Sequence, residues 1–144
     1  LLRSVHRLLE AEMEAQDVSL KMYLPDERLM ILGDEEQLEQ VLINLIKNGV
    51  EACKGAETPC VEVVAYQPEQ ERDRVRIEVT DNGAGIPDDV LDKIFIPFYT
   101  TKKQGSGIGL SLSKQVMQQH GGSIRVSTKP GETTFTLQLK LMSA

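Results

Sequence analysis

The sequence predicts an α+β domain in which helices cover one face of a mixed, mostly antiparallel sheet. Three observations lead to this fold class. Alternating apolar residues predict several short strands, segments with helical apolar spacing lie among them, and the two kinds of element do not alternate regularly as in a doubly wound fold. The 144 residues suffice for one domain whose core needs no disulfide or metal.

The first half of the chain predicts two helices and two short strands. Residues 1–15 place apolar side chains at helical spacing, which predicts an amphipathic helix. The alternation in 19–23 and the short apolar run 29–32 each predict a strand. Asp34 can cap a helix that begins at the next residue, and apolar positions at helical spacing carry that helix through 35–54.

The second half predicts four strands and two helices. Alternating apolar residues predict strands at 61–65 and 74–80, joined by a hairpin connection. A proline suits the first turn of a short helix at 87–94, and helical spacing returns at 110–120 before two glycines end that helix. The stretch 95–106 has no clear period and predicts a mobile loop. The closing strands are expected at 123–128 and 133–141.

Charge and cysteine content restrict the class of partner. A net charge of −6 argues against a surface for nucleic acid or anionic membranes, because such a surface needs a basic stripe. Cys53 and Cys60 match no CxxC pattern, and we expect two reduced thiols. The chain has no apolar run of about 18 residues, the length that spans a bilayer. We therefore expect a cytoplasmic domain that does not contact a membrane.

Two glycine clusters predict a nucleotide site. The segment 81–87 (DNGAGIP) places a carboxylate in a glycine turn, and the segment 105–110 (GSGIGL) opens a helix with three further glycines. Each cluster alone is also typical of an ordinary turn. Five glycines in two clusters indicate backbone that lies close to a ligand. Asp81 can accept a hydrogen bond from the exocyclic amine of adenine, and the unpaired N–H groups at the start of the later helix favour phosphate.

The helix at 35–54 carries an amide-rich stripe that suits a cation. Asn44 and Asn48 stand four residues apart on one face, away from the apolar positions. Asn is a poor helix former, so a merely solvated face would more readily carry Glu, Lys or Arg. Their two amide oxygens can face one Mg²⁺ ion that also binds phosphate oxygens. Lys102 and Lys103 could add positive charge from the neighbouring loop.

These motifs resemble the catalytic and ATP-binding domain of sensor histidine kinases, in the superfamily that includes gyrase, heat-shock chaperone and mismatch-repair ATPases. The segment 40–52 resembles the family's N box, 81–87 its G1 box, 94–99 its F box and 105–110 its G2 box. The resemblance implies a two-layer α/β sandwich, with a mixed sheet under three main helices. It also implies that 16–144 form the catalytic domain. Residues 1–15 would be the residual helix or linker of a missing dimerisation domain.

The resemblance implies a set of site residues. Asn48 would be the principal Mg²⁺ ligand with Asn44 supporting it, and Lys102 would face phosphate because Glu51 stands where many sensor kinases carry Lys or Arg. Catalysis would depend on these two asparagines and this lysine. Phe98 would anchor the ATP lid. The residues expected to contact ATP are Asn48, Ala52, Asp81, Gly83, Gly85, Ile86, Thr100, Thr101, Lys102, Gly105, Ser106, Gly107, Ile108, Gly109, Leu110 and Thr133.

One departure from the superfamily's ATPases favours a kinase. Those ATPases carry Glu where Asn44 stands, and an amide cannot act as the general base that activates water. Transfer to a histidine needs no such base, because neutral imidazole is already a nucleophile. Two alternatives remain open: an ATP-hydrolysing domain of the gyrase type, and a nucleotide-binding regulatory module without catalysis.

The resemblance also implies partners outside this sequence. Neither His6 nor His120 lies in the sequence context of the family's phosphoacceptor, and the position of His120 at a helix end predicts a C-terminal capping role. The acceptor would be a histidine on the dimerisation domain of the same parent protein, and a response regulator would receive the phosphoryl group afterwards. We expect this fragment to be monomeric and its parent to be a homodimer.

Overall fold

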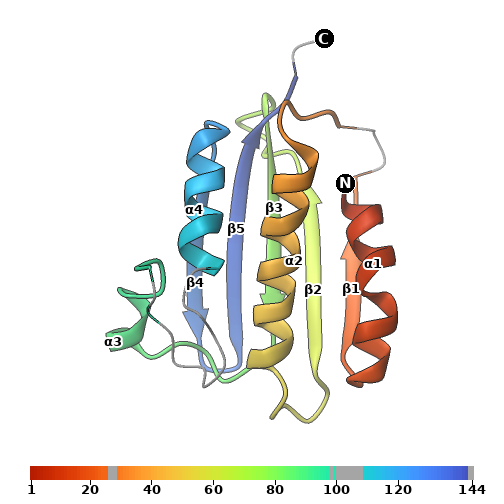
Figure 1. Cartoon of the computed structure of the whole chain (residues 1–144), viewed down its shortest axis with the longest axis vertical. Helices are drawn as coiled ribbons and strands as arrows, with labels where there is room; N and C mark the ends of the chain where they lie inside the picture. The colour runs from red at the N-terminus through yellow and green to blue at the C-terminus, as the bar shows by residue number, and fades with distance from the viewer. Residues whose placement is uncertain (26–28, 98, 100–108, 143–144) are drawn as a thin grey trace.

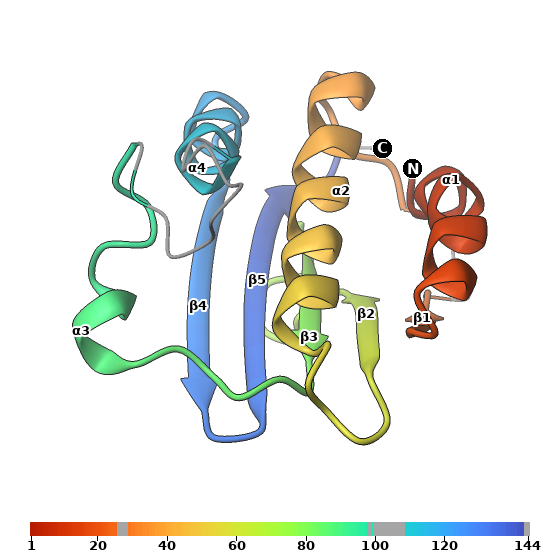
Figure 2. The ribbon, with the colours of Figure 1, turned by 60° about the horizontal axis from the view of Figure 1, so that its bottom comes forward.

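The computed structural model describes residues 1–25, 29–97, 99 and 109–142. It has two layers, a five-stranded sheet and a set of helices packed on one of its faces (Figures 1 and 2). This arrangement confirms the predicted fold class. In chain order the elements are α1 (Leu2–Ala15), β1 (Ser19–Tyr23), α2 (Glu35–Ala52), β2 (Cys60–Tyr66), β3 (Arg74–Asp81), α3 (Asp88–Leu91), α4 (Gly109–Gln119), β4 (Ser123–Lys129) and β5 (Glu132–Lys140).

The sheet is mixed and mostly antiparallel, with the strand order β1-β2-β3-β5-β4. β1 pairs with β2 in parallel, and the other neighbours pair antiparallel. The register places Asp81, the last residue of β3, opposite Thr133 in β5 and opposite Val61 in β2. A carboxylate and a hydroxyl thus meet at one end of the central strands.

The core lies between the sheet and the helices. In β2, β3 and β5 every second residue is buried, which places their apolar side chains on the helical face. α2 buries one apolar stripe on this face, and Asp34 caps its start by accepting the N–H of Gln37 at 3.2 Å, as the sequence predicts. Among the described residues, the largest fully buried side chains are Leu42, Leu45, Ile46, Met117, Leu137, Val5, Val61, Val63 and Cys53.

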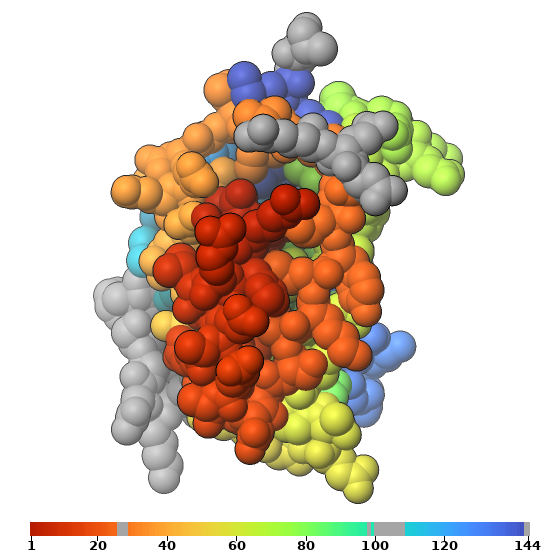
Figure 3. All heavy atoms as spheres, turned by 90° about the vertical axis from the view of Figure 1, so that its right-hand side faces the viewer, coloured from red at the N-terminus to blue at the C-terminus, as the bar shows by residue number. Residues whose placement is uncertain are grey.

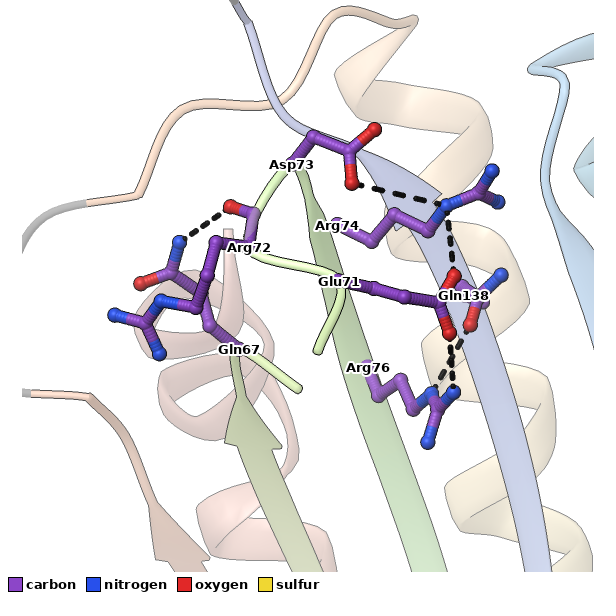
Figure 4. Close-up of polar contacts among 7 residues, drawn as sticks. All are labelled: Gln67, Glu71, Arg72, Asp73, Arg74, Arg76 and Gln138. Atoms are coloured by element: carbon purple, nitrogen blue, oxygen red, sulfur yellow. Dashed lines mark hydrogen bonds and ion pairs between the residues drawn. The ribbon is translucent and has the colours of Figure 1, made fainter. Parts of the chain in front are cut away.

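The opposite face of the sheet is polar and, within the described residues, carries no helix (Figures 1 and 2). Figure 4 shows its contacts near the β2–β3 connection. The guanidinium of Arg76 donates to Gln138 at 3.0 Å and pairs with Glu71 at 3.1 Å, and Arg74 pairs with the same carboxylate. These half-exposed ion pairs add little stability and keep this face compatible with water.

α1 is part of the same core as the rest of the chain. Its buried residues Val5, Leu9 and Met13 belong to one cluster with α2 and the sheet. Figure 3 shows α1 lying along the side of the molecule next to the strand β1. The expected boundary at residue 15 therefore separates no packing units, and the relation of this helix to a dimerisation domain stays a prediction.

The strand predicted at 29–32 is absent and the helices predicted at 35–54 and 87–94 end early, whereas the other predicted bounds agree with the structure to within one residue. The run 29–32 forms no strand, because only Ile31 meets the sheet, in an isolated bridge to Leu141 just beyond the end of β5. After Ile31 the chain leaves the sheet and enters α2 at Glu35. α2 ends at Ala52, two residues early, and α3 ends at Leu91, with turns continuing through Ile96. Most of the predicted loop at 95–106 lies outside the described residues.

Candidate functional site

The predicted site residues that the structure describes lie on elements that converge toward one end of the molecule, the lower end in Figure 1. β3 ends there, α2 ends there, and the β4–β5 hairpin turns there (Figure 2). α4 begins on the same side, at Gly109. The sequence predicts that two glycine segments converge here around the amide-bearing helix, and of the second segment the structure describes Gly109 and Leu110.

Asp81 is a carboxylate on the apolar face of the sheet. The alternation of β3 that buries Val75, Ile77 and Val79 also buries Asp81, which is 5% exposed. Its Oδ1 accepts the N–H of Gly83 at 2.9 Å. Burial raises the pKa of Asp81, and the hydrogen bond from Gly83 opposes that rise. The result is a fixed, poorly hydrated acceptor, suited to a ligand that brings a hydrogen-bond donor.

The loop after Asp81 needs glycine because backbone from two other elements touches it. A Cβ at Gly83 would overlap the carbonyl oxygen of Ala52 at the end of α2 and lie 2.8 Å from its carbon. Gly85 has φ +93°, and a Cβ there would lie 2.7 Å from the carbonyl oxygen of Lys129. The loop is therefore held between α2 and the end of β4.

Asn82 fixes the start of this loop through its side chain. Its Oδ1 accepts the N–H of Cys60 at 2.9 Å, and its Nδ2 donates to the carbonyl of Thr58 at 2.7 Å. The amide thus extends the pairing of β2 and β3 by one position. Sequence reasoning treated this residue only as part of a turn, and the signal available was the preference of Asn for such turns.

Asn44 joins α2 to the first turn of α4. Its Nδ2 donates to the hydroxyl of Ser113 at 3.3 Å, and that hydroxyl donates to the carbonyl of Gly109 at 2.8 Å. A Cβ at Gly109 would overlap the Oδ1 of Asn44, so the last glycine of the second cluster permits this close approach. Asn48 lies one helical turn further along α2 and is half-buried. Sequence reasoning missed Ser113, whose buried place on α4 depends on the packing of two helices.

A chain of hydroxyl groups lies beside Asp81. Thr133 is 3% exposed and its Oγ1 lies 2.8 Å from the Oγ1 of Thr128. Thr128 also accepts the N–H of Ile86 at 2.9 Å, which ties the loop after β3 to the end of β4. Sequence reasoning identified Thr133 and Ile86 and missed Thr128. The alternation of β4, which turns every second side chain to the helical face, was the signal that could have found it.

A cavity of about 620 Å³ lies elsewhere, toward the opposite end of the sheet. It is lined by α1, the connection before α2, and the first half of β3 at Val75 and Ile77. None of the predicted site residues lines it. The polar groups around Asp81 therefore locate the candidate site better than this apolar cavity does.

A family model described as histidine kinase-, DNA gyrase B-, and HSP90-like ATPase matches residues 33–143. The chain belongs to this family. The match covers all of the site elements, from the start of α2 to the end of β5, and agrees with the resemblance carried by the four sequence motifs.

Similar proteins place this ATPase-family chain with the sensor histidine kinases. The C4-dicarboxylate transport sensor protein DctB of Rhizobium meliloti is 38% identical over 92% of this chain and 21% of its own length. The sensory histidine kinase/phosphatase NtrB of Vibrio alginolyticus is 33% identical over 99% of this chain and 42% of its own. The catalytic domain of histidine kinase ThkA matches with a TM-score of 0.83 and 30% identity, over 96% of this chain and 88% of that one.

The chain therefore has the sequence and fold of a histidine kinase catalytic domain, and it spans between a fifth and about two fifths of the two curated relatives named above. In this histidine kinase domain the structure brings together Asp81, Thr133, Gly83, Ala52, Gly85 and Ile86 on one side. Asn44 and Gly109 meet on the other. Leu110 follows in the first turn of α4 and is half-buried.

Several expected ligand contacts of the kinase domain lie outside the described residues. These are Thr100, Thr101, Lys102, Gly105, Ser106, Gly107 and Ile108, together with the expected lid anchor Phe98. The preceding aromatic residue of the F box, Phe95, packs edge-on against Phe135 of β5 with ring centroids 6.5 Å apart. Both cysteines are free, as expected. No helix in the described part of the chain is long and apolar enough to span a membrane.

Proposed function

We propose that this domain binds Mg-ATP at the site around Asp81 and donates the γ-phosphoryl group to a histidine on a separate dimerisation domain of its parent protein. The observation that carries the proposal is Asp81 itself, a buried acceptor beside a hydroxyl and a glycine loop. Adenine offers an amine donor next to a ring-nitrogen acceptor, which complements this pair. A relative, full-length ShkA, was solved in complex with AMPPNP, which supports a nucleotide in this fold.

The residues on α2 fit a magnesium ion that arrives with the nucleotide. The amide oxygens of Asn48 and Asn44 are neutral, hard donors on a half-buried stripe. Among the described residues, no group of three or more His, Cys, Asp or Glu side chains could hold a metal alone. Phosphate oxygens and water would complete the shell, and the ion would neutralise phosphate charge. Asn48 would hold it, with Asn44 supporting.

The chemistry of Asn44 favours transfer over hydrolysis. Its amide donates to Ser113, and it cannot take a proton from water. A histidine acceptor brings its own nucleophile, so the domain needs only to position the triphosphate and neutralise its charge. Lys102 is the side chain that we expect to contribute positive charge from the loop.

The acceptor histidine belongs to another domain. Both ring nitrogens of His120 already have partners: Nδ1 lies 2.8 Å from the carbonyl of Val116, and Nε2 accepts the N–H of Asp34 at 3.0 Å. The bond to Val116 fits the predicted capping role at the end of α4. ThkA was solved in complex with the response regulator TrrA, which supports a response regulator as the indirect partner here. A cytoplasmic location and a homodimeric parent are part of the same proposal.

A transfer assay tests this function. The full-length parent is incubated with γ-labelled ATP and Mg²⁺, and we expect label first on a histidine and then on an aspartate of an added response regulator. Asn48→Ala should abolish labelling, whereas Gln40→Ala, which removes an exposed amide one helical turn before Asn44 on α2, should leave it unchanged. Steady phosphate release without labelling would indicate a gyrase-type ATPase. ATP binding without either product would indicate a regulatory module.

A further inference from the structure

Thr128 stands at the centre of a hydrogen-bonded chain that ends at the candidate adenine site. The N–H of Ile86 donates to its Oγ1 at 2.9 Å, and its Oγ1 lies 2.8 Å from that of Thr133. The two threonines face each other across β4 and β5, in the directly paired register. The turn between these strands holds them there, with Gly131 at φ +87°.

The contact with Ile86 favours Thr128 as the donor of this pair. A hydroxyl has one hydrogen to give and two lone pairs that can accept. Because Thr128 already accepts the N–H of Ile86, its own hydrogen finds an acceptor when it points to the oxygen of Thr133. The hydrogen of Thr133 is then free to point toward a ligand. The reverse arrangement would fill both lone pairs of Thr128 and leave its own hydrogen without this partner.

The freed hydrogen of Thr133 lies next to the carboxylate that would recognise adenine. Thr133 and Asp81 are paired across β5 and β3 and share the helical face of the sheet. With its hydrogen free, Thr133 is a donor and ionised Asp81 an acceptor. The pair matches the N1 acceptor and the amine donor of adenine. A reversed hydroxyl would turn an oxygen lone pair toward N1 and lose the match.

We propose that Thr128 is a positioning residue for base recognition: it holds Thr133 as a hydrogen-bond donor to adenine N1, directly or through one water, and fixes the loop at Ile86. This inference rests on the proposed function, because it presumes ATP at this site. It assigns Thr128 a role in selectivity rather than in the transfer step.

The test compares the affinities for two ligands, because a general loss of structure would weaken both and leave their ratio unchanged. ATP and 1-deaza-ATP, which has carbon in place of N1, are titrated by calorimetry into the chain with Mg²⁺. We expect the wild type to bind ATP about fivefold more tightly than 1-deaza-ATP, the worth of one hydrogen bond. In Thr128→Val that ratio should fall to about one, because the hydroxyl of Thr133 loses its orientation. Thr128→Ser, which keeps the hydroxyl, should preserve the ratio.

A matched control is Thr134→Val on the opposite face of the sheet. It is also a Thr→Val change and also removes a hydroxyl contact, here the 2.9 Å contact between Thr134 and Thr80. Because that contact lies on the face away from the candidate site, the preference for ATP should stay about fivefold. Equal affinity of the wild type for the two ligands would overturn the inference without any variant, as would an unchanged ratio in Thr128→Val. If the folded wild type bound neither ligand, the proposed function would itself be wrong.

Discussion

Replacing Gly83 by alanine should destabilise the domain, because the new methyl group has no room. It would overlap the carbonyl oxygen of Ala52 and lie 2.8 Å from the carbonyl carbon and 2.9 Å from Oδ1 of Asp81. Two of these three atoms belong to the backbone of the last turn of α2, which cannot rotate away. Either the loop or the end of the helix must move.

Gly55 provides the matched control for the magnitude. A Cβ there would meet nothing within 4 Å, and neither Gly55 nor Gly83 has a positive φ. Gly→Ala therefore removes similar freedom from the unfolded chain at both sites, a gain of about 0.4–1 kcal/mol. The difference between the two variants isolates the steric cost at Gly83, which for an overpacked methyl group is about 1–3 kcal/mol.

Urea unfolding of both variants measures this difference. If the unfolding free energy depends on urea concentration with the same slope in both variants, the urea midpoint of Gly83→Ala should be the lower one. The difference in midpoint should correspond to about 1–3 kcal/mol of unfolding free energy. ATP affinity should fall only in Gly83→Ala, since the loop that bonds to Asp81 is displaced. Equal midpoints would refute the close approach of this loop to α2.

Three further predictions concern single side chains. Asp81→Asn should raise the melting temperature of the ligand-free domain at neutral pH, because burial raises the pKa of Asp81 and makes its ionised form unfavourable. Wild-type stability should rise as pH falls through that pKa, so the gain should vanish in acid, and a gain that persisted there would contradict the assignment. His120→Ala should cost about 1 kcal/mol of unfolding free energy, because the N–H of Asp34 loses its acceptor; an unchanged urea midpoint would argue against this contact. Asn44→Asp should also cost about 1 kcal/mol, since a carboxylate cannot donate to Ser113, and equal stability would speak against that bond.

The fold class was predictable because its signals are local. In 74–80, the residues that the sequence alternation predicts to be buried are the ones that are buried in the structure. The same alternation continues to Asp81. Asp34 caps α2 through a contact only three residues away. The wrong prediction at 29–32 shows the limit of such signals, because an apolar run becomes a strand only when a neighbour is free to pair with it.

The site was predictable as a set of residue types and only partly as contacts. Asp81, Gly83 and Gly85 follow from the first glycine motif and Thr133 from the family resemblance, and the structure places Thr133 opposite Asp81 and Gly83 beside it. The role of Thr128 depends on the register of a hairpin and on a loop that lies 42 positions earlier in the chain. The bond between His120 and Asp34 joins residues 86 positions apart. Periodicity carries no information about such pairs.

Calorimetric titration of the folded chain with ATP, with and without Mg²⁺, tests the central claim most directly. A nucleotide site around Asp81 predicts saturable heat with one ATP per chain, tighter binding with Mg²⁺ than without, and loss of the heat in Asp81→Asn. Absence of heat with ATP or ADP under both conditions, or unchanged binding in Asp81→Asn, would contradict it.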